Sequence, residues 1–254
     1  MSLTVACAVQ AQPLSFVALG DMPYGPRAQT QAPYERLIEA VNRTGLPFTL
    51  HIGDIKSGST RCDDEEFVFQ KGNLQRFATA LIYTPGDNEW TDRWQAQGVA
   101  LATVHVVGSN NNRDPKRPEA LAEYEARDKA NVAWIQSVFE WAKATQAKAV
   151  VLAMQADPFE SSLPSQAFPP ESGFTRSIGQ TLLPLAQQSG MPVLLVHGDS
   201  HRYTFDQPFK LDGHLVANLY RLQVPGGAGD YRAVKVTAQP EQTQRPFVVE
   251  LIAP

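Results

Sequence analysis

Short apolar runs alternate with longer amphipathic runs through the first 200 residues, and this alternation constrains the fold most. The strand-like runs lie at residues 15–19, 48–52, 80–84, 104–107, 149–154 and 193–196. The helix-like runs between them lie at residues 33–43, 63–77, 119–146 and 175–188. Strands that alternate with helices predict βαβ units and buried parallel strands, so we expect an α/β fold.

The last part of the chain has a different pattern. Helical periodicity is absent after residue 200, and three strand-like runs close the chain at residues 215–224, 231–236 and 247–252. We expect these runs to add antiparallel strands to the sheets. Pro184 should kink or break the helix that contains it. The loop-rich stretches at residues 109–118 and 157–173 are interpreted as insertions, so we predict one domain over residues 13–254.

Composition narrows the classes of partner. Hydrophobic residues make up 43% of the 254 residues, enough for a sizeable core, and the net charge is −4. Nucleic acid is not expected as a partner, because phosphate-backbone binding favours a basic face. No segment reaches the roughly 20 apolar residues that span a bilayer. The two cysteines cannot form a disulfide framework. No protein partner can be inferred.

The first twelve residues resemble the end of a secretory signal peptide. They are small and apolar, with Ala8 and Ala11 at the spacing typical of a cleavage site. We therefore expect a periplasmic or secreted protein. A frayed N-terminus on a cytoplasmic protein is the alternative.

Four strand-like runs are followed by the same dipeptide: Gly20-Asp21, Gly53-Asp54, Gly86-Asp87 and Gly198-Asp199. A single Gly-Asp after a strand is usually a turn or a helix N-cap. Four of them predict more, since the carboxyl ends of parallel strands gather at one rim where ligands bind. Four carboxylates at one rim would repel each other unless divalent cations lie among them.

His201 lies two residues after Asp199 and could add a nitrogen ligand. If residues 199–201 are extended, the two side chains point the same way and can reach one metal cluster. The alternative is an ordinary surface or core histidine.

These motifs, taken in order, resemble those of the calcineurin-like metallophosphoesterases, which include the purple acid phosphatases. The matching segments are Gly20-Asp21, Gly53-Asp54, Gly86-Asp87-Asn88-Glu89, Met154-Gln155 and Gly198-Asp199-Ser200-His201. The resemblance implies a four-layer α-β-β-α sandwich, with two mixed β-sheets flanked by helices and metals at the strand ends. It further implies that Asp21 and His201 bind the first metal, and that Asp54 bridges two metals.

The chain departs from the family at several histidine positions. Pro23 replaces the histidine of the first motif, and Asn88 replaces the catalytic histidine. Tyr24 could offer a phenolate instead. The second metal position would then be formed by oxygen ligands from Asp87, Gln155 and Asp199. Such ligands favour Mg²⁺, Mn²⁺ or Ca²⁺ over Zn²⁺, and one or two ions could bind.

Four residues are candidates for holding the substrate phosphate: Lys56, Asn88, Asn111 and Arg202. Each has an ordinary alternative, because lysine and arginine are mostly exposed and asparagine clusters are common in turns. By contrast, His51 and His197 lie on strands and are expected to pack rather than to bind metal.

We therefore expect a hydrolase that cleaves phosphate esters of small molecules with metal-activated water. Asn88, Asp54 and His201 are the predicted catalytic residues, with Asn88 orienting the phosphate. The alternative is a catalytically degenerate relative that only binds metal or a phosphorylated ligand. A third possibility is a hydrolase with one metal or none, in which Lys56 supplies positive charge.

Overall fold

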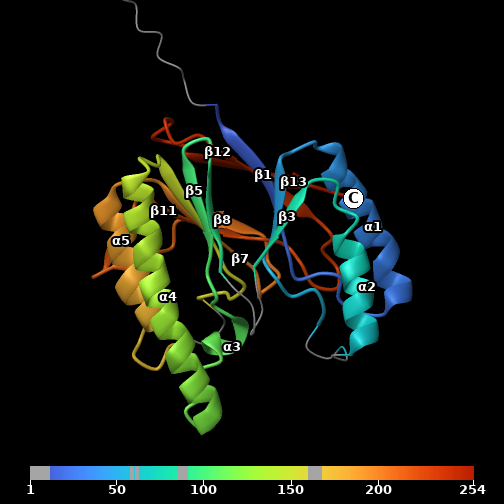
Figure 1. Ribbon diagram of the computed structural model, residues 1–254, viewed down its shortest axis with the longest axis horizontal. Helices are drawn as coiled ribbons and strands as arrows, with labels where there is room; N and C mark the ends of the chain where they lie inside the picture. The colour runs from blue at the N-terminus through green and yellow to red at the C-terminus, as the bar shows by residue number, and fades with distance from the viewer. Residues whose placement is uncertain (1–11, 58–59, 61–62, 85–90, 160–167) are drawn as a thin grey trace, which may run out of the picture.

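The structure is a computed structural model that describes residues 12–57, 60, 63–84, 91–159 and 168–254. Two mixed sheets lie face to face, and helices cover their outer faces (Figure 1). The predicted four-layer α-β-β-α sandwich is therefore confirmed. The predicted signal segment falls almost wholly outside the described residues, so export stays a prediction.

The first sheet has five strands in the order β13-β12-β1-β2-β3. Its members are β1 (Leu14–Leu19), β2 (Phe48–His51), β3 (Ala80–Tyr83), β12 (Ala233–Ala238) and β13 (Phe247–Ile252). Strands β1, β2 and β3 are parallel, whereas β12 and β13 are antiparallel additions, as expected from the closing part of the sequence. Helices α1 (Arg27–Arg43) and α2 (Asp64–Leu74) flank this sheet (Figure 1).

The second sheet has six strands in the order β4-β5-β6-β7-β11-β8. Its members are β4 (Arg93–Ala96), β5 (Val99–Thr103), β6 (Ala149–Ala153), β7 (Val193–His197), β8 (Thr204–Asp206) and β11 (Leu219–Gln223). A small hairpin of β9 (Lys210–Leu211) and β10 (His214–Leu215) stands apart. Helix α4 (Pro118–Ala144), the π-helix Thr175–Leu182 and α5 (Leu183–Ser189) cover this sheet.

Two expectations about the strands are wrong. Residues 104–107 are not a strand, because β5 ends at Thr103 and these residues form the loop that leads to α3 (Gly108–Asn111). Strand β11 is parallel to β7, although the closing strands were expected to be antiparallel. The helix is not broken at Pro184: the π-helix ends at Leu182 and α5 begins at Leu183, and both residues keep helical φ and ψ angles, so the helical backbone continues from one element to the other.

Apolar side chains fill the space between the layers. The cluster between the two sheets contains Phe16, Leu50, Val151, Leu194 and Val236, all buried. Separate clusters join each sheet to its own helices. This packing fixes the two sheets face to face, so the loops after their parallel strands meet at one edge. Among the described residues, no helix has the length and apolar character needed to cross a bilayer.

Candidate metal and phosphate site

The loops that follow β1, β2 and β7 place their aspartates in a backbone conformation that is uncommon for residues other than glycine. Asp21, Asp54, Asp199 and His201 have φ angles of 53°, 51°, 74° and 56°. These left-handed conformations cost energy for residues with a Cβ, although Asp tolerates them better than most, and they cluster at functional sites. The expectation that residues 199–201 are extended is therefore wrong.

The glycines before these aspartates are required mainly by close packing. A Cβ on Gly198 would lie 2.1 Å from Asp21 Oδ2, and one on Gly20 would lie 2.3 Å from Ile52 Cγ1. Of Gly20, Gly53 and Gly198, the three described glycines that precede an aspartate of the site, only Gly53 has a positive φ, of 90°. The Gly-Asp dipeptides thus let neighbouring loops approach closely enough for their carboxylates to meet.

Hydrogen bonds join the three described aspartate loops. Asp21 Oδ2 accepts a bond of 3.0 Å from the backbone N–H of Asp199. Asp54 Oδ2 accepts two bonds, one of 2.9 Å from the Tyr24 hydroxyl and one of 3.2 Å from Gln155 Nε2. The structure therefore brings five of the predicted residues to one rim: Asp21, Tyr24, Asp54, Gln155 and Asp199.

Asp21 lies in an environment that disfavours its charge. Its side chain is fully buried, and its Oδ1 has no hydrogen-bond partner. Burial raises the pKa of Asp21 well above its usual value, and the nearby charges of Asp54 and Asp199 raise it further. A buried carboxylate of this kind is stabilised by a cation, which replaces the lost hydration.

The same negative charges keep Tyr24 protonated. Burial raises the pKa of the Tyr24 phenol far above its usual value, and the carboxylates of Asp54 and Asp21 add to this shift. The hydroxyl therefore donates to Asp54 at neutral pH. A phenolate ligand, which the sequence suggested for Tyr24, requires a bound cation to offset these charges.

His201 stands beside this group, half-buried. Its ring meets the Tyr24 ring edge-on, with the ring centroids 5.0 Å apart. Burial lowers the pKa of His201, and the charge of Asp54 opposes this shift. A lowered pKa leaves the imidazole neutral at neutral pH, which is the form that binds metals or accepts a proton.

These donors do not form a closed coordination shell. Within the described ranges, no group of three or more His, Cys, Asp or Glu side chains is arranged to hold a metal ion. The buried, unpartnered Oδ1 of Asp21 next to Asp54 still fits a cation that keeps several waters. Mg²⁺ commonly binds in this way, through one or two carboxylates.

Asp157 is a residue of this region that the sequence analysis missed. Its buried carboxylate accepts a 2.6 Å bond from the Ser200 hydroxyl, and its backbone N–H donates to Asp199 Oδ2 at 3.3 Å. Asp157 therefore ties the loop after β6 to the loop that carries Asp199 and His201. Its place shortly after a buried strand, like the predicted aspartates, was a signal that could have found it.

The residues predicted to bind the substrate phosphate differ in their contacts and in their exposure. Lys56 Nζ contacts carbonyls of its own loop, at 3.5 Å from Ser57 and 3.3 Å from Thr60. Arg202 is exposed next to His201, so its role stays a prediction. Asp87 and Asn88 lie outside the described residues, and their roles also stay predictions.

The prediction that Asn111 binds substrate needs correction. Asn111 is fully buried, and its side chain bonds the Gly173 carbonyl at 2.9 Å, the Val107 N–H at 3.3 Å and Arg127. An amide whose hydrogen bonds are all made inside the fold does not face a ligand. His51 and His197 are fully buried, as expected for packing histidines.

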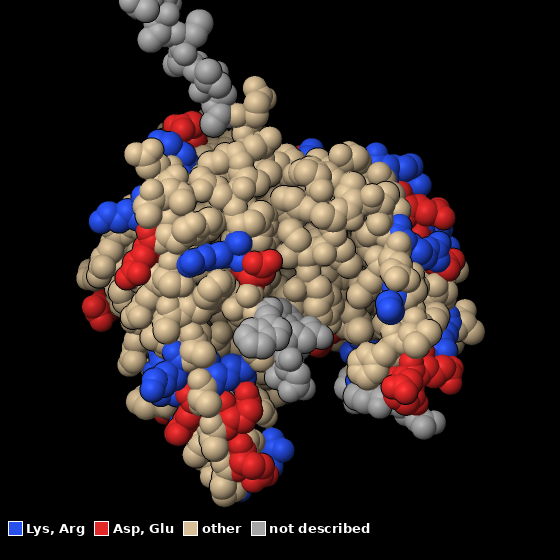
Figure 2. Space-filling view, viewed as in Figure 1, with Lys and Arg blue, Asp and Glu red and all other residues tan. Residues whose placement is uncertain are grey.

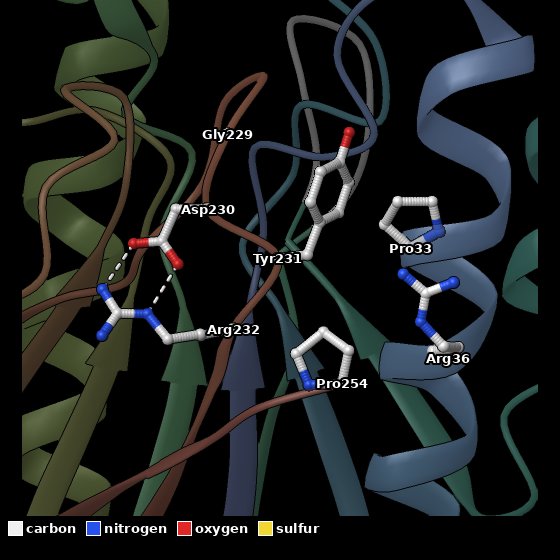
Figure 3. A pocket seen from close by; sticks show the side chains of 7 residues that line it. All are labelled: Pro33, Arg36, Gly229, Asp230, Tyr231, Arg232 and Pro254. Carbon is white, nitrogen blue, oxygen red and sulfur yellow. Dashed lines mark hydrogen bonds and ion pairs between the residues drawn. The ribbon is translucent and has the colours of Figure 1, made fainter.

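A cavity of about 490 Å³ lies away from these residues (Figure 3). It is lined by Pro33, Arg36, Gly229, Asp230, Tyr231, Arg232 and Pro254. Asp230 and Arg232 form an ion pair of 2.6 Å at its edge, which neutralises both charges. None of the predicted site residues lines this cavity.

Comparisons with known proteins support the fold. No family model and no curated protein matches the sequence. A dimetal phosphatase from Danio rerio has a similar structure, with a TM-score of 0.63 and 9% identity, covering 95% of this chain and 99% of that chain. A purple acid phosphatase from yellow lupin seeds has a TM-score of 0.52 and 10% identity, covering 96% of this chain and 54% of that chain. At such low identity, the likeness shows that this chain shares the fold of these two phosphatases.

Proposed function

We propose that this chain is a metal-dependent phosphoesterase that acts on small phosphorylated molecules. The observation that carries the proposal is the meeting of Asp21, Asp54 and Asp199 at one rim, with Asp21 buried and its Oδ1 unpartnered. The fold shared with phosphatases supports it. On the face drawn in Figure 2, basic and acidic side chains are mixed, so that face offers no continuous basic surface to a nucleic-acid backbone.

The rim residues have separable roles in this proposal. Asp21 and Asp54 would hold a hard divalent cation, with Mg²⁺, Mn²⁺ or Ca²⁺ favoured by their oxygen ligands. When bound, the cation would lower the pKa of a water and offset negative charge on the phosphoryl group. Tyr24 and Gln155 orient the Asp54 carboxylate by donating to its Oδ2.

His201 and Arg202 complete the proposed site from the next loop. The neutral His201 ring would bind the cation or accept a proton from the attacking water. Arg202 would clamp a phosphate oxygen, since its guanidinium is exposed beside His201. Asn88 keeps its predicted role of orienting the phosphate.

The test is turnover of aryl phosphate monoesters and diesters with Mg²⁺, Mn²⁺, Ca²⁺ and Zn²⁺ added in turn. Asp54→Asn should lower kcat/KM at least about 100-fold, as expected for loss of a group that stabilises the transition state. Asp212→Asn is the matched control, because Asp212 also has a left-handed φ, of 50°, but lies in the exposed turn between β9 and β10. Undiminished turnover in Asp54→Asn would refute the site.

A binding protein without turnover is the second candidate. The replacement of the family's catalytic histidine by Asn88 favours it. In that case the folded protein should bind a divalent cation or inorganic phosphate in calorimetry while hydrolysing none of the esters with any ion. Turnover that is lost in both Asp54→Asn and His201→Ala, but kept in His214→Ala, would exclude it.

A further inference from the structure

The loop between β11 and β12 contains the densest group of glycines in the sequence. Three of the 17 glycines, Gly226, Gly227 and Gly229, lie within four residues. The first two are buried, whereas Gly229 is exposed. Because a residue without a Cβ lets two backbones approach closely, buried neighbouring glycines indicate a loop that packs tightly against other segments.

Backbone hydrogen bonds fix this loop to both sheets. The Val224 N–H donates to the carbonyl of His197, the last residue of β7, at 2.8 Å. The Gly227 N–H donates to the carbonyl of Asp21, just after β1, at 2.7 Å. The loop therefore crosses the rim from the second sheet to the first, at the place where the carboxylates of the candidate site lie.

Gly226 packs against the main chain around Asp21. A Cβ on Gly226 would lie 2.6 Å from Asp21 Cβ and 3.0 Å from the carbonyl oxygens of Asp21 and Gly20. Two of these three atoms belong to the backbone, which cannot give way as the end of a flexible side chain can. The distance between the loop and the segment that carries Asp21 is therefore fixed by direct contact.

Gly227 packs against the ring of His201. A Cβ on Gly227 would lie 2.9 Å from Nδ1 and 3.2 Å from Cγ of His201. Gly227 also has a φ of 81°, in the region that favours glycine. The same imidazole meets the Tyr24 ring edge-on. The His201 ring is therefore contacted by Tyr24 and by the backbone of Gly227, and these contacts limit the directions in which its nitrogens can point.

We propose that Gly227 is a positioning residue of the site: anchored to the Asp21 carbonyl, its backbone places the His201 ring relative to Asp21. A side chain at this position would push the imidazole away, because the half-buried ring yields more easily than the backbone around Asp21. The inference rests on the proposed function only in giving Asp21 and His201 a common cation. The position of the His201 ring is measured without metal or substrate.

The first experiment follows the His201 ring protons by NMR in the metal-stripped full chain, with the signals assigned by their loss in His201→Ala. Gly227→Ala places a Cβ against the ring, so these signals should move. Gly229→Ala is the matched control in the same loop, since a Cβ there meets nothing within 4 Å and the signals should stay in place. Gly227→Asn adds the same Cβ but tolerates the left-handed backbone better, so it serves if Gly227→Ala does not fold.

The second experiment measures Mn²⁺ affinity by titration with electron paramagnetic resonance. Gly227→Ala should weaken binding about 10-fold, as expected when a group that orients a metal ligand is disturbed, and Gly229→Ala should not. In a His201→Ala background, Gly227→Ala should cause no further loss, because the ring through which Gly227 acts has been removed. A merely structural role for Gly227 would weaken binding equally in both backgrounds.

Two outcomes would overturn the proposal. They are His201 signals that stay in place in the Gly227 variants, and a loss of Mn²⁺ affinity that is the same with and without the His201 ring. The two proposals fail separately. A chain whose His201 signals move but which binds no Mn²⁺ and hydrolyses no phosphate ester keeps this inference and loses the proposed function. A chain that hydrolyses esters while the His201 signals stay in place does the reverse.

Discussion

Gly198 has no side chain, and this leaves room for the Asp21 carboxylate in the site. A Cβ at this position would lie 2.1 Å from Asp21 Oδ2 and 2.2 Å from Ile52 Cδ1. Both atoms are buried and packed from several sides, so neither can move away freely. The space that Gly198 leaves empty is the space that the Asp21 carboxylate occupies.

We predict that Gly198→Ala destabilises the fold by about 3 kcal/mol, the upper range for overpacking a core. It should also lower Mn²⁺ affinity, because Asp21 must shift. Urea unfolding and metal titration measure the two effects. Gly72→Ala is the control: a Cβ there meets nothing within 4 Å in helix α2, so this change should stabilise the protein by about 1 kcal/mol. Equal stability of the two variants would contradict the packing argument.

The sequence predicted that three of the described aspartates converge but not their backbone conformation, and the convergence of Asp87 stays a prediction. A Gly-Asp after each buried strand was enough to place Asp21, Asp54 and Asp199 at one rim. The left-handed backbone at these residues was not foreseeable, because Asp occupies extended and left-handed conformations in similar motifs. Neither was the direction of the Gln155 amide, which depends on Gly108, 47 positions away in sequence.

Helix α3 and helix α4 act together as a unit that supports the site. Arg127, on α4, is nearly buried and donates to carbonyls of His105 and Asn111 as well as to the Asn111 side chain. These hydrogen bonds offset the energetic cost of the left-handed turn at residues 109–112, since each residue in that conformation costs about 1 kcal/mol or more. The turn places the Gly108 N–H where it donates to Gln155 Oε1.

We predict that Arg127→Gln destabilises the fold by about 3 kcal/mol, because it leaves buried carbonyls of the turn without donors. Chemical denaturation monitored by tryptophan fluorescence measures the loss. The control is Arg117→Gln at the start of the same helix, where the arginine pairs with Asp114 in solvent and its removal should change little. If both variants are equally stable, Arg127 does not hold the turn.

The elements themselves were predicted well where a periodic pattern was long, and less well where it was short. Helix α4 was expected at residues 119–146 and lies at Pro118–Ala144. Helix α1 was expected at residues 33–43 from its apolar spacing, but it begins at Arg27 and passes through Pro33. The hairpin of β4 and β5 was missed because a run of Ala and Val also suits a helix or a loop.

The arrangement of the two sheets brings the loops of the site together. Three parallel strands in the first sheet and four in the second run to the same edge, which is the lower edge in Figure 1 where α3 lies. The sheets are fixed face to face by the apolar cluster between them. Loops that are distant in sequence are therefore held together by the core as well as by their own hydrogen bonds. The core helps the fold to tolerate the repulsion among the three clustered aspartates.

Each sheet also contains one fully buried histidine, and together they make global stability depend on pH. Burial lowers the pKa of His51, in β2, to about 3. In β7, burial lowers the pKa of His197 to about 4, although the charge of Asp157 partly opposes the shift. An unfolded chain has histidine pKa values of about 6.5, so between these limits only the unfolded state takes up protons. The stabilisation is complete above about pH 6.5 and is lost as the pH falls, down to about 4 for His197 and about 3 for His51.

Each histidine should therefore lower the free energy of unfolding by up to about 1.4 kcal/mol for every pH unit below about pH 6.5. Asp21 acts in the opposite direction, since its raised pKa means that stability is lost as the pH rises. Urea unfolding of the unmodified chain at about pH 7 and about pH 5 gives the net change in the free energy of unfolding.

His51→Gln keeps an acceptor for the Gly53 N–H and should reduce the acid destabilisation by about 2 kcal/mol over that interval. His214→Gln changes an exposed histidine and should show the same pH dependence as the unmodified chain. If His51→Gln also does so, His51 is protonated in the folded state and the buried, neutral form is refuted.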